Sequence, residues 1–88
     1  GVYPVGSVVE LSSGELALVL SAEPDSKLQP KVMIFTNAEK QHALPHRLMD
    51  LAEEERRAGG GLAIRRVVEP GSVGIDIKTI ANHHKGLL

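Results

Sequence analysis

Residues 3–20 read YPVGSVVELSSGELALVL, and this stretch decides the fold that the sequence predicts. Two apolar runs, residues 7–11 and 15–20, flank the turn-forming segment Ser12-Ser13-Gly14. Gly14 can adopt the positive φ that tight hairpin turns require, so the stretch predicts an antiparallel β-hairpin. Because neighbouring side chains in a strand point to opposite faces, both faces of this hairpin are apolar. A two-stranded hairpin is marginal in water, so we expect partner strands from the rest of the chain.

Three further strands are predicted, over residues 31–36, 41–44 and 62–68, and Pro45 is expected to end the second of them. Residues 47–58 leave two interpretations open. The run of Glu and Arg favours a solvated helix, whereas residues 48–51 could instead be an extended segment that closes a barrel.

Glycine and capping signals complete this outline. Residues 59–61 are three consecutive glycines, which predict a flexible break in the chain. Asp76 can cap a short C-terminal helix over residues 77–82. The sequence therefore predicts one mostly β domain over residues 1–88, a small antiparallel SH3-like barrel or curled sheet of about five strands. The chain begins with Gly, and we expect it to be a piece excised from a longer multidomain protein.

Composition narrows the classes of partner. Ten Lys and Arg residues face eleven Asp and Glu, a net charge of −1, and Tyr3 and Phe35 are the only aromatic residues. This balance argues against a nucleic-acid ligand, which small barrels bind with basic grooves or aromatic side chains. No apolar run reaches the roughly 20 residues that span a bilayer, so we expect no membrane insertion. The chain has no cysteine, which fits a cytoplasmic location and removes thiolate metal sites.

The four histidines suggest a metal site, but their spacing is unfavourable. His42 and His46 lie four residues apart, but Pro45 argues against the helix that would align them. His83 and His84 are adjacent and near the C-terminal end. We therefore expect solvated histidines and no metal site. The sequence also shows no nucleophile motif, no marked acid–base pair and no cofactor fingerprint, so it predicts neither catalytic nor cofactor-binding residues.

Two arginine pairs, Arg56-Arg57 and Arg65-Arg66, flank the glycine triplet. The favoured interpretation is a solvated charged surface, since three glutamates precede the first pair. Arg65 and Arg66 are the candidates for binding a phosphate or carboxylate. Because strand residues alternate between faces, only one of the two is expected to join a given patch.

The opening stretch resembles a pattern found in bacterial HD-GYP-type proteins after their catalytic domain, YPVG-x-x-V-x-L-S-x-G-x-x-A-x-V. Pro30-Lys31-Val32, Asp50-Leu51-Ala52 and Gly74-Ile75-Asp76 are similar to shorter segments of the same region. HD-GYP proteins are metal-dependent phosphodiesterases of cyclic di-GMP. The resemblance implies an accessory domain, because this sequence has neither the His-Asp pair nor the Gly-Tyr-Pro triplet of the catalytic domain.

The same resemblance implies a partner, either the preceding catalytic domain of the same polypeptide or a signalling protein. The apolar hairpin would follow directly after that catalytic domain. We therefore expect an exposed apolar patch near Val5, Val8 and Val19 that packs against it. The alternative function is a small module that binds an anionic ligand, a nucleotide or nucleic acid, through Arg65 or Arg66.

Overall fold

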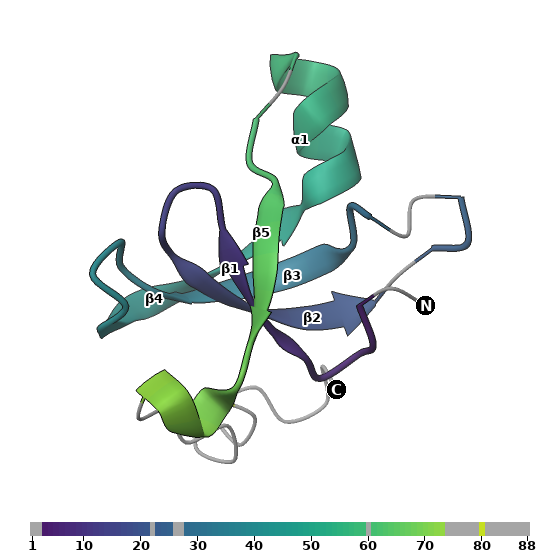
Figure 1. Cartoon of the computed structure of the whole chain (residues 1–88). Coiled ribbons are helices and arrows are strands. Elements are labelled where there is room, and N and C mark those ends of the chain that lie inside the picture. Colours follow the sequence, from purple (N-terminus) through teal and green to yellow (C-terminus); the bar gives the residue numbers. More distant parts are fainter. Residues whose placement is uncertain (1–2, 22, 26–27, 60, 74–79, 81–88) are drawn as a thin grey trace.

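A computed structural model describes residues 3–21, 23–25, 28–59, 61–73 and 80, and Figure 1 shows its elements. In chain order they are β1 (Val8–Leu11), β2 (Leu16–Ser21), β3 (Lys31–Thr36), β4 (His42–Asp50), α1 (Leu51–Ala58), β5 (Ile64–Val68) and the 3₁₀ helix η1 (Pro70–Val73). The chain is mostly β, as the sequence predicts.

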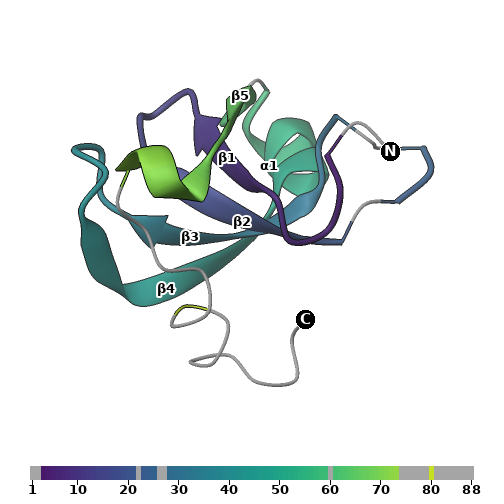
Figure 2. The ribbon, with the colours of Figure 1, turned by 60° about the horizontal axis from the view of Figure 1, so that its bottom comes forward.

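The strands form one antiparallel sheet in the order β4-β3-β2-β1-β5. This confirms the curled-sheet form of the prediction. The barrel form requires β4 to pair with β5, and the described strands leave these two at opposite edges. The helix α1 follows β4 in the chain and precedes β5, so it connects the two edge strands (Figures 1 and 2).

Apolar side chains are buried on both faces of the sheet, as the two-faced hairpin predicts. Alternation along the strands divides them into two clusters. The Phe35 cluster contains Val8, Leu16, Leu18, Met33, Phe35, Val68 and Ile80. The Ile34 cluster contains Val9, Leu11, Ala17, Val19, Val32, Ile34 and Leu51. Leu51 of α1 covers part of the Ile34 cluster. Ile80, from the C-terminal region, covers part of the Phe35 cluster.

The hairpin that opens the chain forms where expected. Gly14 has a φ of 93°, and its N–H donates to the carbonyl of Leu11 at 2.9 Å. A Cβ on Gly14 would lie 3.0 Å from the carbonyl oxygen of Ala38. The turn between β1 and β2 therefore needs glycine for its backbone conformation and for its close approach to the turn between β3 and β4.

The prediction that Pro45 ends the fourth strand is wrong. β4 continues to Asp50 and is the longest strand of the described sheet. Thr36 pairs with His42 and Ile34 with Arg47, so residues 43–46 bulge opposite the single residue between the two β3 partners. β4 is an edge strand, and a proline within such a bulge removes no ladder hydrogen bond.

Both interpretations of residues 47–58 are partly right. The chain is extended up to Asp50 and helical from Leu51. The Asp50 carboxylate caps the helix, since it accepts hydrogen bonds from the backbone N–H groups of Ala52 and Glu53. Gly59, with a φ of 67°, ends the helix in the left-handed conformation. The flexibility predicted for residues 59–61 stays a prediction, as does the single-domain boundary at residues 1–88.

The short C-terminal helix that the sequence predicts can be compared with the structure at one residue. The helix expected over residues 77–82 lies outside the described residues, except for Ile80. That side chain is 5% exposed and belongs to the Phe35 cluster.

Candidate functional site

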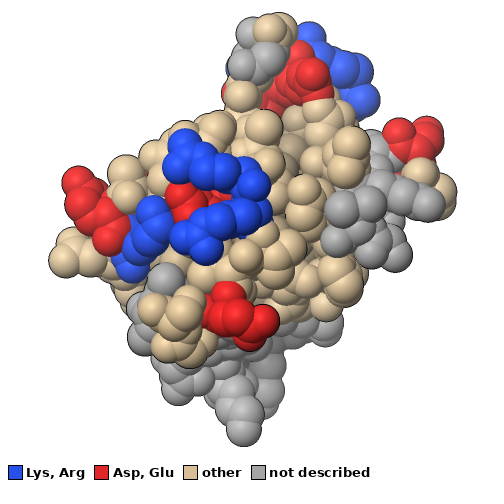
Figure 3. Space-filling model, viewed as in Figure 1, with Lys and Arg blue, Asp and Glu red and all other residues tan. Residues whose placement is uncertain are grey.

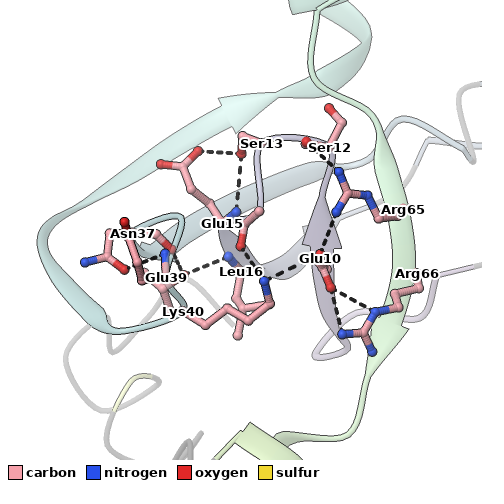
Figure 4. A network of polar contacts seen from close by, with 12 residues as sticks. Glu10, Ser12, Ser13, Glu15, Leu16, Asn37, Glu39, Lys40, Arg65 and Arg66 are labelled. Atoms are coloured by element: carbon pink, nitrogen blue, oxygen red, sulfur yellow. Dashed lines mark hydrogen bonds and ion pairs between the residues drawn. The ribbon is translucent and has the colours of Figure 1, made fainter.

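Glu10 is a buried carboxylate surrounded by three cationic side chains. Its Oε2 lies 2.9 Å from Nη1 of Arg65 and 3.5 Å from Nζ of Lys40. Its Oε1 accepts from Nε of Arg66 at 2.8 Å and lies 2.7 Å from Nη2 of the same side chain. Figure 4 shows the three cations converging on this carboxylate, Arg65 and Arg66 from β5 and Lys40 from the turn before β4. We call these four residues the Glu10 cluster.

The structure places Arg65 and Arg66 on the same patch, so the expectation that only one could join it is wrong. Glu10 pairs with Arg66 and Leu11 with Ile64, which leaves Arg65 as an extra residue in the β1–β5 ladder. Such a bulge interrupts the strict alternation of a strand and turns the extra side chain toward its neighbour. The bulge therefore lets both guanidinium groups reach Glu10.

Neighbouring backbone groups hold the cations in place. Arg65 Nη2 donates to the carbonyl of Ser12 at 2.8 Å. Lys40 has a φ of 66° in the turn before β4, and its Nζ donates to the carbonyl of Gly14 at 3.2 Å. The cluster thus connects the β1–β2 turn, the β3–β4 turn and β5, which are distant in sequence.

The cluster carries an excess of positive charge at the surface. Three cations face one carboxylate, and the Glu10 side chain is 5% exposed while those of Lys40 and the two arginines are 30% and 55% exposed. Figure 3 shows the blue side chains around a recessed acidic group on one face of the molecule. Burial raises the pKa of Glu10, but the charges of Lys40 and the arginines outweigh this effect, and the pKa lies below its usual value.

Sequence reasoning missed Glu10 and Lys40 as members of this site. The signal for Glu10 was present, because it is the one charged residue in a strand whose other members are all apolar. A carboxylate on a buried strand needs cationic partners. Lys40 carried no comparable signal, since its position depends on how the β3–β4 turn packs against the first hairpin.

The predicted packing patch does not form as expected. Val8 and Val19 are 1% and 0% exposed, and they belong to different clusters on opposite faces of the sheet. Pairing with both neighbouring strands and cover on both faces account for their burial. Val5 alone is exposed, at 57%.

A different apolar surface lies beside the edge strand β4. A shallow groove there is lined by Leu20, Ser21, Lys31, Val32, Leu48, Met49 and Asp50. Leu48 is 62% exposed although it stands opposite the buried Met33 in the sheet. Val5 lies toward the same end of β2, because the N–H of Gly6 bonds to the carbonyl of Val19.

His42 and His46 lie together in the structure. The two Nε2 atoms are 2.6 Å apart and the ring centroids are 4.9 Å apart. Among the residues that the structure describes, no three His, Cys, Asp or Glu side chains form a group that could hold a metal ion.

The described part of the chain also contains no helix of sufficient length and apolar character to cross a bilayer.

Comparison with known proteins finds one relative that matches part of the chain, and one protein family. No solved structure matches the chain at a significant level. Over 51 residues it is 41% identical to a cyclic di-GMP phosphodiesterase of Pseudomonas aeruginosa. That match covers 58% of this chain and 12% of the relative, so the chain corresponds to a small part of the enzyme.

The family comparison covers more of the chain. The model of the KOW domain associated with HD domain matches residues 8–73. This match includes most of the first hairpin, whose pattern resembles the accessory region of HD-type phosphodiesterases, and it confirms that resemblance. The chain belongs to the family of KOW domains associated with HD domains.

Proposed function

We propose that this chain is a non-catalytic accessory domain of a bacterial cyclic di-GMP phosphodiesterase, and that it packs against the HD domain of the same polypeptide. The family match over residues 8–73 carries the proposal. The Pseudomonas relative, itself named a cyclic di-GMP phosphodiesterase, supports the enzymatic setting of the parent protein. The proposal assigns the chemistry to the HD domain, gives this chain no cofactor and places it in the cytoplasm.

The groove beside β4 is the surface that suits packing against the HD domain. It presents the exposed Leu48 next to Leu20, Val32 and Met49. An exposed large apolar side chain that continues into an apolar groove is typical of an interaction surface. Val5 lies toward the same end of β2 and stays in the proposal as a second contact. The domain would then modulate the HD domain, or recruit a further signalling protein while attached to it.

A pair of matched substitutions in an HD-containing parent protein tests this role. Leu48→Glu places a charge in the groove, whereas Leu28→Glu changes a side chain of similar exposure, 64%, in the β2–β3 loop. We expect Leu48→Glu to alter the rate of cyclic di-GMP hydrolysis and to lower the unfolding temperature of the HD domain. Leu28→Glu should leave both unchanged. Equal behaviour of the two variants would contradict packing through this groove.

The Glu10 cluster favours a second candidate function, the binding of an anionic ligand. Three cations exceed the single charge of Glu10, and each arginine has five N–H donors, more than its contacts with Glu10 and Ser12 use. Arg65 and Arg66 are therefore preorganised by a buried carboxylate and still exposed to a ligand. A phosphate group of a nucleotide or nucleic acid has the charge and geometry that paired guanidinium groups bind.

Titration of the ¹⁵N-labelled chain with pyrophosphate, cyclic di-GMP and an RNA oligomer tests the second candidate. We expect shifts centred on Lys40, Arg65 and Arg66 that weaken with added salt. Arg65→Gln should reduce them, because Arg66 and Lys40 still pair with Glu10 and keep the fold. Arg57→Gln is the control, since Arg57 pairs with Glu54 on α1. Absence of shifts at millimolar ligand would reject the anion site and leave the packing role untouched.

A further inference from the structure

The close approach of His42 and His46 is not explained by the accessory role or by the Glu10 cluster. Their Nε2 atoms are 2.6 Å apart, within hydrogen-bond distance, and the ring planes are inclined by 50°. Both residues belong to β4, the edge strand of the sheet. His42 is exposed and His46 half-buried, so a solute can reach the pair.

The register of β4 creates this approach. In a regular strand, residues four apart lie on the same face but are separated by about 13 Å, at about 3.3 Å per residue. Here the β3–β4 ladder resumes at Arg47 opposite Ile34 after pairing His42 with Thr36. The bulge over residues 43–46 shortens the distance between the two histidines and points their rings at each other. A spacing of four residues brings two side chains together in a helix but not in a regular strand. The bulge in β4 brings His42 and His46 together without a helix.

We propose that His42 and His46 form a two-histidine site for a borderline divalent metal ion such as Zn²⁺. Neutral imidazole nitrogens are preferred ligands of such ions. The two Nε2 atoms face each other at hydrogen-bond distance, so in a pair of neutral rings one of them carries the proton that the other accepts. When the ion binds, the ring that carries this proton moves it to its own Nδ1, so both rings stay neutral and both Nε2 lone pairs are donated to the ion.

Metal binding requires both rings to move. Zinc binds imidazole nitrogen at about 2.0–2.1 Å, so two such nitrogens at a tetrahedral ion lie about 3.4 Å apart. The two nitrogens therefore separate by less than 1 Å, and both rings also turn, because they now point end to end whereas two ligands of a tetrahedral ion meet at an angle. Two protein ligands leave the other positions to water, which makes this an exposed, exchangeable site and not a closed structural one.

Zinc titration of the full chain, followed through the ¹⁵N signals of the histidine rings, tests the proposal. We expect the Nε2 signals of His42 and His46 to shift together with one Zn²⁺ per chain. His42→Gln and His46→Gln should each weaken binding at that site by at least about tenfold, because even partners outside the ligand shell contribute that much to metal affinity. Far-ultraviolet circular dichroism should confirm that both variants keep the sheet.

The control removes the other two histidines. A His83→Gln/His84→Gln double variant should bind Zn²⁺ with unchanged affinity at the β4 pair. The proposal is overturned if only the signals of His83 and His84 respond to Zn²⁺, if the single variants in β4 bind as tightly as the native chain, or if no ring signal moves at millimolar Zn²⁺.

Discussion

Thr36 shows how one hydroxyl can join two strands in the core. The residue is 3% exposed, and its Oγ1 accepts a hydrogen bond from the backbone N–H of Leu16 at 2.8 Å. The same hydroxyl donates to the carbonyl of Asn37 at 2.9 Å. It thus satisfies the first backbone donor of β2, which would otherwise be buried without a partner.

We predict that Thr36→Val lowers the free energy of unfolding by about 1–3 kcal/mol. The substitution keeps the shape of the side chain but leaves the N–H of Leu16 buried and unpaired. Urea unfolding, followed by circular dichroism, measures the loss. Thr36→Ser retains the hydroxyl and should cost less than Thr36→Val, so the reverse order would contradict the role given to Oγ1.

Glu10 gives the stability of the chain a pH dependence whose sign follows from its lowered pKa. The usual value is 4.5, and the folded chain holds this carboxyl below it. The unfolded chain therefore takes up the proton at a higher pH than the folded chain. The contribution of the Glu10 cluster is complete above the usual value and is lost as the pH falls through the lowered one.

We predict that Glu10→Gln lowers the urea midpoint at pH 7 and that this difference from the native chain shrinks below about pH 4.5. Protonation of Glu10 in the native chain removes the same charge that the substitution removes. Midpoints measured between about pH 3 and pH 7 for both chains test the prediction. A difference that does not vary with pH would mean that the ion pairs of Glu10 contribute nothing to stability.

At the scale of elements, the short helix α1 depends for its stability on the residues at its N-terminal end. Asp50 ends β4 and caps α1, with its Oδ1 3.1 Å from the N–H of Ala52 and 3.2 Å from that of Glu53. The helix has eight residues, too few to be stable without its cap and its packing. Leu51 supplies that packing as a member of the Ile34 cluster.

We predict that Asp50→Ala lowers the free energy of unfolding by about 1 kcal/mol, the usual cost of losing an N-cap. Asp50→Asn keeps an oxygen acceptor at the cap and should be nearly neutral. Chemical denaturation of both variants provides the comparison. Equal losses would indicate that charge, and not capping, is the contribution of Asp50.

Which elements could be predicted from the sequence depends on whether their signal is local. The strand over residues 31–36 was predicted with the bounds that β3 has, because alternation and flanking turns are local signals. The continuation of β4 past Pro45 and the bulge at Arg65 could not be predicted in the same way. Each depends on the register between strands distant in sequence.

For the whole molecule, the sequence predicted the two-faced apolar sheet but not what covers each face. The expectation of an exposed patch at Val8 and Val19 assumed that another domain covers them. α1 and Ile80 contribute that cover within the chain. The position of the Glu10 cluster likewise depends on the sheet as a whole, since its members come from β1, β5 and the β3–β4 turn.

The open sheet leads to a prediction about local stability. β2 is paired on both sides and is central in the strand order, whereas β4 is paired only with β3. Most β4 side chains are also exposed, so few buried contacts hold this strand. Local opening of an edge strand therefore costs less free energy than unfolding of the whole sheet.

We predict that hydrogen-bonded amides of β2 exchange with solvent only through global unfolding, while those of β4 exchange by local opening at least about tenfold faster. Native-state hydrogen exchange by NMR measures both, and low urea should accelerate β2 more than β4. Equal protection would show that β4 is held as firmly as the centre. β4 presents Leu48, His42 and His46. A ligand that binds these side chains would therefore change the local opening of this edge strand and leave the core of the sheet in place.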